Sequence, residues 1–166
     1  MATSKRKASS LTRSQTRSNL QAVIRKALEN IEKFGWHITG VFPTADDASK
    51  GWFAYTTGAT TRKLPEIVIT GVPFETSAGL INELLKSIES GKETLREDTP
   101  YTEICNMPIY LRKLTMAQVE GYMYMTGNFH QGKEYPVYQF VYPDPNGKFP
   151  WEDGYDFPPQ VLLFKR

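Results

Sequence analysis

The chain has 166 residues, 40% of them apolar and 23% charged, with a formal net charge of +2. This length and composition are typical of one globular domain, and no apolar run reaches the ~20 residues that a membrane helix needs. A single cysteine, Cys105, excludes an internal disulfide and any zinc cluster built on cysteines. Because the N-terminus also lacks the apolar segment of a signal peptide, we expect a soluble, cytoplasmic protein with no membrane contact.

Positive charge is concentrated at the N-terminus. Residues 1–28 hold seven lysines and arginines and no acid, whereas the rest of the chain has 13 cations and 18 anions. Residues 1–17 lack hydrophobic periodicity and are expected to form a flexible basic tail before a single domain over 18–166. Three roles stay open for the basic segment: solubility, weak binding of nucleic acid or an acidic partner through residues 1–28, and an organelle transit peptide.

The first predicted helix follows this tail. Ser18 and Gln21 have the spacing of a capping box, and Gly35 is a residue type that often ends helices. Between them one face carries apolar residues at helical spacing: Leu20, Val23, Ile24, Ala27, Leu28 and Ile31. We expect this stripe to pack on the sheet that follows.

Three strands are predicted next, over 36–42, 52–56 and 66–72. The first alternates apolar and polar residues, and turn-forming residues separate it from the second, so these two strands are expected to pair antiparallel. The third is rich in isoleucine and valine, which predicts a central strand covered on both faces.

The second half of the chain predicts a helix over 74–90 and then a strand somewhere within 101–114, interrupted by Pro108, which favours an edge or a bulge. A helix from Met116 to about Met125 follows and opens with a Thr115–Gln118 capping box. Strands over 137–142 and 160–164 complete the pattern. This order favours an α+β fold, a single domain with a mixed or mostly antiparallel sheet of about five strands and about three helices.

One loop stands out as a candidate binding site. The connection between the second and third strands combines hydroxyls, a glycine and an arginine, a set that can hold an anion through donors and close backbone approach. It lacks the spacing of a phosphate-binding P-loop, and a solvated connection is the plain alternative. We expect it to meet a later aromatic loop in one pocket, and the candidate ligand-binding residues are Tyr55, Thr56, Thr57, Gly58, Arg62 and Trp151.

The two histidines, His37 and His130, are the only side chains whose ordinary pKa suits a neutral-pH general base, and they are the candidate catalytic residues. Packed structural roles are the alternative for each. The acidic residues show no ligand spacing, so neither a metal site nor a cofactor is expected. Eleven of the 21 aromatic rings lie within 122–157, more than a small core readily hides, so some are expected to line a cleft or an interface.

Four segments in order, "GWHITGVFP", "FAYTTGA", "PEIVITGVP" and "QFVYPDPNGKFPWEDGY", resemble the bacterial proteins grouped as domain of unknown function 4262. The resemblance covers about residues 31–155. Members often carry a histidine before the Pro-Glu pair, where this chain has Leu64, so no role of that histidine transfers. The resemblance implies the placement of fold and motifs, and it implies no activity.

Three functions follow from these residues. The first is a domain that binds a small anionic, nucleotide-like ligand without catalysis, in a setting such as bacterial or phage conflict. The second is a hydrolase-type enzyme with a histidine general base and a nearby carboxylate. The third is a protein-interaction or assembly module, for which a homodimer is the generic oligomer.

Overall fold

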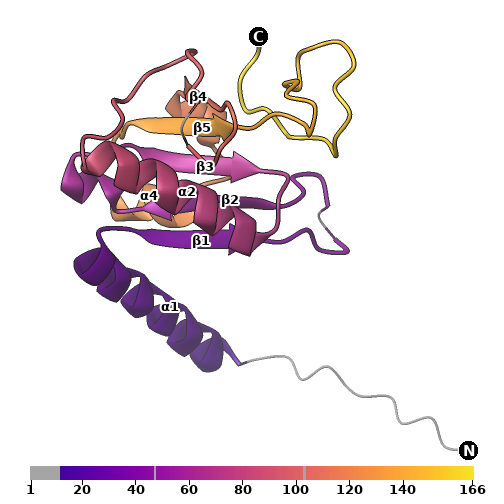
Figure 1. Cartoon of the computed structure of the whole chain (residues 1–166). Helices are drawn as coiled ribbons and strands as arrows, with labels where there is room; N and C mark the ends of the chain where they lie inside the picture. The colour runs from indigo at the N-terminus through magenta and orange to yellow at the C-terminus, as the bar shows by residue number, and fades with distance from the viewer. Residues whose placement is uncertain (1–11, 47, 103) are drawn as a thin grey trace, which may run out of the picture.

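A five-stranded mixed sheet in the order β1-β2-β3-β5-β4 forms the centre of the computed structural model, which describes residues 12–46, 48–102 and 104–166 (Figure 1). The parallel pair is β3 with β5, and the other neighbours are antiparallel. The strands are β1 His37–Val41, β2 Phe53–Thr57, β3 Glu66–Thr70, β4 Tyr110–Lys113 and β5 Val137–Val141. The predicted α+β fold with about five strands is confirmed, including the central position of β3 and the edge position of β4.

Four α-helices and one 3₁₀ helix lie around the sheet within the described residues. Helix α2 packs against β2 and β3 on one face, while α4 packs against β2 on the other. Helix α1 lies beside β1, along that edge of the sheet (Figure 1). The bounds are α1 Arg13–Phe34, η1 Ala59–Arg62, α2 Phe74–Glu89, α3 Met116–Val119 and α4 Tyr124–Phe129. Among these, none has the length and apolar character needed to cross a membrane.

Alternation along the strands divides the core into two layers. Ile67 and Ile69 of β3 point toward α2, while Val68 between them packs with α3, α4 and the C-terminal segment on the other face. All five residues of β3 are buried. This is the arrangement expected of a central strand whose middle three residues, Ile67, Val68 and Ile69, are apolar and β-branched.

Helix α1 begins earlier than predicted. The capping box is formed by Thr12 and Gln15, in which the Gln15 N–H donates to Thr12 Oγ1 at 3.2 Å, so the predicted start at Ser18 is wrong. Residues 13–17 contain neither glycine nor proline, and the helix extends through them to the upstream box. Residues 12–17 of the predicted tail therefore belong to this element, while residues 1–11 lie outside the described part. Gly35 ends the helix in the left-handed conformation, as predicted.

Two later predictions also need correction. The helix predicted from Met116 is a single turn, because the chain turns through Gly121 at φ 79° and a separate α4 follows. No strand forms over 160–164. There the backbone bonds to side chains instead: Val161 O accepts from Gln139 Nε2 at 2.8 Å, and Leu163 N–H donates to Gln139 Oε1 at 2.8 Å.

Candidate functional site

The loop after β2 does hold an anion, and the anion belongs to the chain itself. The fully buried carboxylate of Glu66 accepts from Thr56 Oγ1 at 2.6 Å and from the Gly58 N–H at 2.9 Å. The Ala59 N–H approaches the same carboxylate at 3.4 Å. Thr56 in turn accepts from the Ile67 N–H at 2.9 Å, which leaves its own proton for Glu66. Both carboxylate oxygens therefore accept hydrogen bonds, as suits the ionised form.

His130 completes this cluster. Its Nε2 lies 3.2 Å from Glu66 Oε1, and because an ionised carboxylate only accepts, the imidazole donates from Nε2. The ring stacks on Tyr135 with centroids 4.6 Å apart. Burial, and then the negative charge of Glu66, raise the pKa of the Tyr135 phenol to about 12. His130 thus has the carboxylate neighbour that a general base requires.

The hydroxyl groups of Thr57 and Tyr55 also form hydrogen bonds inside the fold. Thr126 Oγ1 donates to the carbonyl of Thr56 at 2.7 Å, so in the 2.9 Å contact between the two hydroxyls Thr57 is the donor. The buried Tyr55 hydroxyl accepts from the Met125 N–H at 3.3 Å. These contacts join β2 to α4.

Arg62 binds an internal acid as well. Its Nη1 lies 2.8 Å from Glu89 Oε1, which ties η1 to the end of α2. The arginine side chain also packs against Gly35, where an added Cβ would clash with it. The predicted anion-binding arginine is therefore already engaged at a partly exposed surface pair.

Trp151 does not share a pocket with Gly58. Glu66 and the Gly58 loop lie at the start of β3, beside the start of its parallel neighbour β5. Trp151 packs on Tyr110, whose partner is the last residue of β5, with ring centroids 5.5 Å apart. The expectation that the two loops wall one pocket is wrong, because the sheet separates them along its length.

His37 lies in a different place, in a groove of about 650 Å³ between α1, β1 and α2. One wall is the flank of α1 with Lys26 and Asn30, and the other is the flank of α2 with Asn82 and Lys86. The remaining lining is aromatic and aliphatic: Phe34, Trp36, Ile38, Phe74 and Ala78. None of the described residues that line this basic groove is acidic.

Hydrogen bonds fix the orientation of two side chains in the basic groove. The Trp36 indole N–H donates to Asn82 Oδ1 at 2.9 Å, which leaves the amide nitrogen of Asn82 as a donor. Asn30 Nδ2 lies 2.9 Å from His37 Nδ1; since an amide nitrogen only donates, Nδ1 is the acceptor and the neutral ring carries its proton on Nε2. Burial, followed by the charge of Lys26, lowers the pKa of His37 below its ordinary value.

Sequence reasoning missed the lysines and asparagines of the basic groove. Their signal was present as four-residue spacing: Lys26 and Asn30 on the first helix, and Ala78, Asn82 and Lys86 on the second. The spacing could not show that these two helix flanks face each other in the folded protein. Within the described residues, no group of three or more acidic, histidine or cysteine side chains is placed to hold a metal ion.

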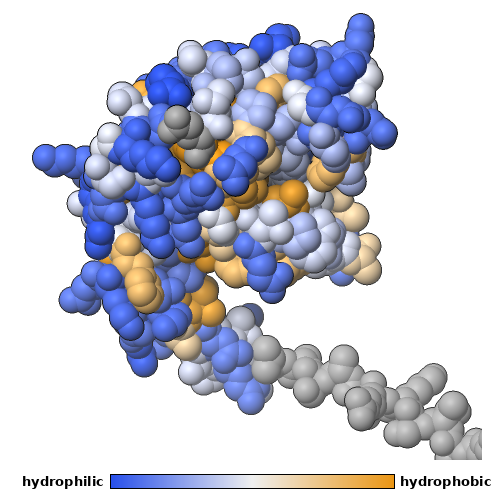
Figure 2. Space-filling view, viewed as in Figure 1, coloured by the Kyte–Doolittle hydropathy of each residue, from blue (hydrophilic) through white to orange (hydrophobic). Residues whose placement is uncertain are grey.

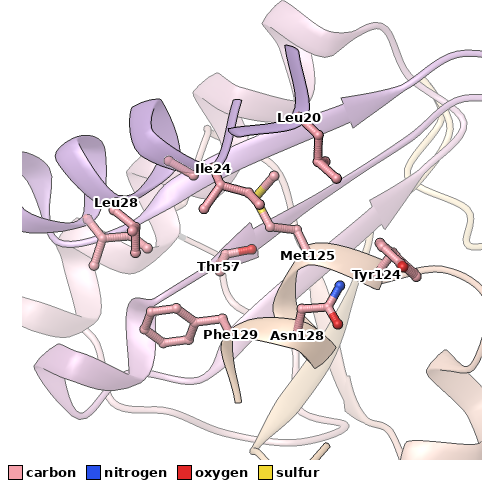
Figure 3. A pocket seen from close by; sticks show the side chains of 10 residues that line it. Leu20, Ile24, Leu28, Thr57, Tyr124, Met125, Asn128 and Phe129 are labelled. Carbon is pink, nitrogen blue, oxygen red and sulfur yellow. The ribbon is translucent and has the colours of Figure 1, made fainter. Parts of the chain in front are cut away.

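The opposite flank of α1 borders a second groove, of about 330 Å³, against α4 (Figure 3). Leu20, Ile24 and Leu28 lie on one side of it, facing Met125 and Phe129 on the other (Figure 3). Its lining is mostly apolar and none of the lining residues is charged, so this groove offers few groups to orient a charged ligand. Helix α1 thus separates a basic groove from an apolar one.

Comparison with protein families places most of the chain in a known family. No curated protein and no solved structure matches the chain significantly. Residues 30–156 match a family described as a domain of unknown function, DUF4262. This span includes the sheet, α2, α3, α4 and the Glu66–His130 cluster, and it excludes most of α1. The chain therefore belongs to the DUF4262 family.

Proposed function

We propose that the protein binds a small anionic ligand with a planar, nucleotide-like part in the basic groove between α1 and α2, without catalysing a reaction. The observation that carries the proposal is the composition of this groove: two lysines, a histidine and two amides beside aromatic rings, and no acid among the lining residues described. Its volume of about 650 Å³ suits a small ligand.

The groove offers separate partners for the two parts of such a ligand. Lys26 and Lys86 lie on opposite walls and provide positive charge for a phosphate or carboxylate. The Phe34 and Phe74 rings provide apolar faces for a planar group. Binding alone would suffice to sequester a nucleotide signal, as in bacterial or phage conflict.

The test compares three probes by calorimetry and thermal shift: AMP, adenosine and inorganic phosphate. AMP has both a charged phosphate and a planar base, so it should bind most tightly of the three. It should raise the melting temperature in proportion to the logarithm of its concentration. The Lys26→Gln/Lys86→Gln double variant should weaken AMP binding roughly tenfold or more, at about 1 kcal/mol for each exposed charge.

Lys165→Gln is the matched control, because Lys165 is exposed and does not line the basic groove. It should leave AMP affinity unchanged. If none of the three probes shifts the melting temperature at about 1 mM, or if the double variant binds AMP as the control does, the proposal fails.

A hydrolase is the second candidate, favoured by the 3.2 Å contact between His130 and Glu66. In this arrangement Glu66 holds the imidazole through Nε2, and Nδ1 is the nitrogen left to take a proton. A screen of nitrophenyl esters and phosphates tests it. Turnover that is lost in His130→Asn but kept in His37→Asn would support this candidate over binding alone.

A further inference from the structure

Helix α1 exposes more apolar surface than its position explains. Of its 22 residues only Ala27 and Ile31 are buried. Four apolar side chains between residues 20 and 28 are 44–55% exposed: Leu20, Val23, Ile24 and Leu28. Figure 2 shows apolar side chains over this helix and along its junction with the body. Because an isolated helix in water depends on packing of its apolar face, this exposure calls for a partner surface.

We propose that the partner is a second copy of this chain, and that two α1 helices pair antiparallel across a two-fold axis. The inference is independent of the ligand proposed for the basic groove, which lies on the other flank of α1. The interface is the apolar groove between α1 and α4 (Figure 3). A row of side chains from the partner helix would fill the groove that Leu20, Ile24 and Leu28 border.

The chemistry of the apolar groove favours a helix over a small molecule. Small-molecule sites combine apolar walls with a few convergent polar groups. Here the Thr57 hydroxyl already donates to Thr126, and the other two polar side chains, Tyr124 and Asn128, are both on α4. The remaining seven lining residues are aliphatic, methionine or phenylalanine. A hollow bordered by two helices also suits a third helix better than a flat membrane surface.

The charges of α1 specify the direction of pairing. Residues 13–26 carry Arg13, Arg17, Arg25 and Lys26 and no acid, whereas residues 27–34 hold both acids of the helix, Glu29 and Glu32, with one cation, Lys33. A parallel pair would place the basic halves side by side. An antiparallel pair places each basic half against the acidic half of its partner.

The spacing also gives the register. With the two-fold axis near Ile24, Leu20 lies opposite Leu28 of the partner subunit, and Arg17 comes close to Glu32 of the partner subunit. Symmetry makes each of these contacts occur twice. Because the pairing involves one helix face from each chain, we expect an interface below the standard size and a dissociation constant roughly in the micromolar range.

Sedimentation velocity of the full chain over a range of concentrations tests the pairing. The unmodified chain should sediment as a dimer at about 100 µM, and Ile24→Glu should remain a monomer there. Ile24 is exposed enough for this variant to fold, and circular dichroism verifies that it does. A monomeric wild type at this concentration, or a dimeric Ile24→Glu, would overturn the proposal.

A charge exchange tests the direction. Arg17→Glu and Glu32→Arg should each weaken the dimer about fivefold, and the two together should restore it, as expected for a partly exposed ion pair. Lys33→Glu makes the same charge change away from the apolar face and should have little effect. If the double variant is weaker than both single variants, the antiparallel pair is wrong. A folded monomer that binds phosphatidylcholine–phosphatidylserine vesicles through Ile24 would instead make α1 a membrane-binding helix and overturn the dimer.

Discussion

Replacing Glu66 with glutamine tests whether the loop after β2 is held by a charge. The substitution keeps the size of the side chain and removes one acceptor oxygen together with the negative charge. In the protein, Oε2 accepts from Thr56 at 2.6 Å and Oε1 accepts from Gly58 at 2.9 Å. In either orientation of the glutamine, its amide NH₂ group faces donors, so at least one of them loses its acceptor inside the core.

The expected loss can be worked from these contacts. A hydrogen bond to a charged group contributes about 1.5–3 kcal/mol, and a buried donor left without an acceptor costs a further ~1–3 kcal/mol. Because Glu66 is fully buried and accepts hydrogen bonds from the loop, we expect Glu66→Gln to lower the free energy of unfolding by about 3–5 kcal/mol. At roughly 2–4 °C for each kcal/mol, the melting temperature should fall by about 6–20 °C.

Urea unfolding followed by tryptophan fluorescence measures this loss, and calorimetry gives the melting temperature. Glu89→Gln is the matched control, because it removes the same charge from the partly exposed pair with Arg62 and should cost at most about 1 kcal/mol. If the free energy of unfolding of Glu66→Gln lies within about 1 kcal/mol of that of Glu89→Gln, the reasoning is refuted. That result is expected if Glu66 is uncharged or if water reaches the loop.

Three further predictions concern other positions. Burial, and then the contact with Glu83, raise the pKa of the Cys105 thiol to about 12. The rate of its alkylation by iodoacetamide should therefore be slow at pH 8 and still increase above pH 10, and Glu83→Gln should increase the rate at pH 8. The lowered pKa of His37 keeps its ring neutral at pH 7, and a bound anion favours the protonated ring. The affinity for a sulfonate, whose charge does not change with pH, should therefore rise as the pH falls from about 8 to 6, as measured by calorimetry. In His37→Gln the affinity should not depend on pH over this range. Gly58→Ala should destabilise the protein by about 1–3 kcal/mol in urea unfolding, since Gly58 has φ 90° and an added Cβ would meet Ile31. Gly79→Ala is the control, because Gly79 lies inside α2 with open space around it and the change should stabilise the helix; equal effects of the two variants would contradict the prediction.

Much of the fold could be predicted because local signals and tertiary structure agree. The isoleucine and valine run of β3 predicts a buried central strand, and Gly35 predicts the end of α1. Sequence patterns fail to predict an element's boundary where two nearby patterns both fit, as at the start of α1. Thr12–Gln15 and Ser18–Gln21 both have the sequence spacing of a capping box, and only the full structure shows that the helix begins at the upstream one.

The candidate site was harder to predict, for a physical reason. Hydroxyls, a glycine and a left-handed turn suit an anion whether it comes from solvent or from the chain, and Glu66 supplied it only eight residues after Gly58. Conversely, Lys26 and Lys86 lie 60 residues apart on two helices, and their shared groove exists only after both helices pack beside β1. Sequence spacing describes one face of one helix at a time.

The position of α1 has a consequence for both proposals. One helix forms a wall of the basic groove with Lys26 and a wall of the apolar groove with Ile24. A ligand on one flank and a second chain on the other would restrain the same element, so each event would favour the other, by the same factor in both directions. The apparent affinity for AMP would then rise with protein concentration. Measuring AMP affinity in a dilution series would therefore give the coupling free energy between ligand binding on one flank of α1 and dimer formation on the other.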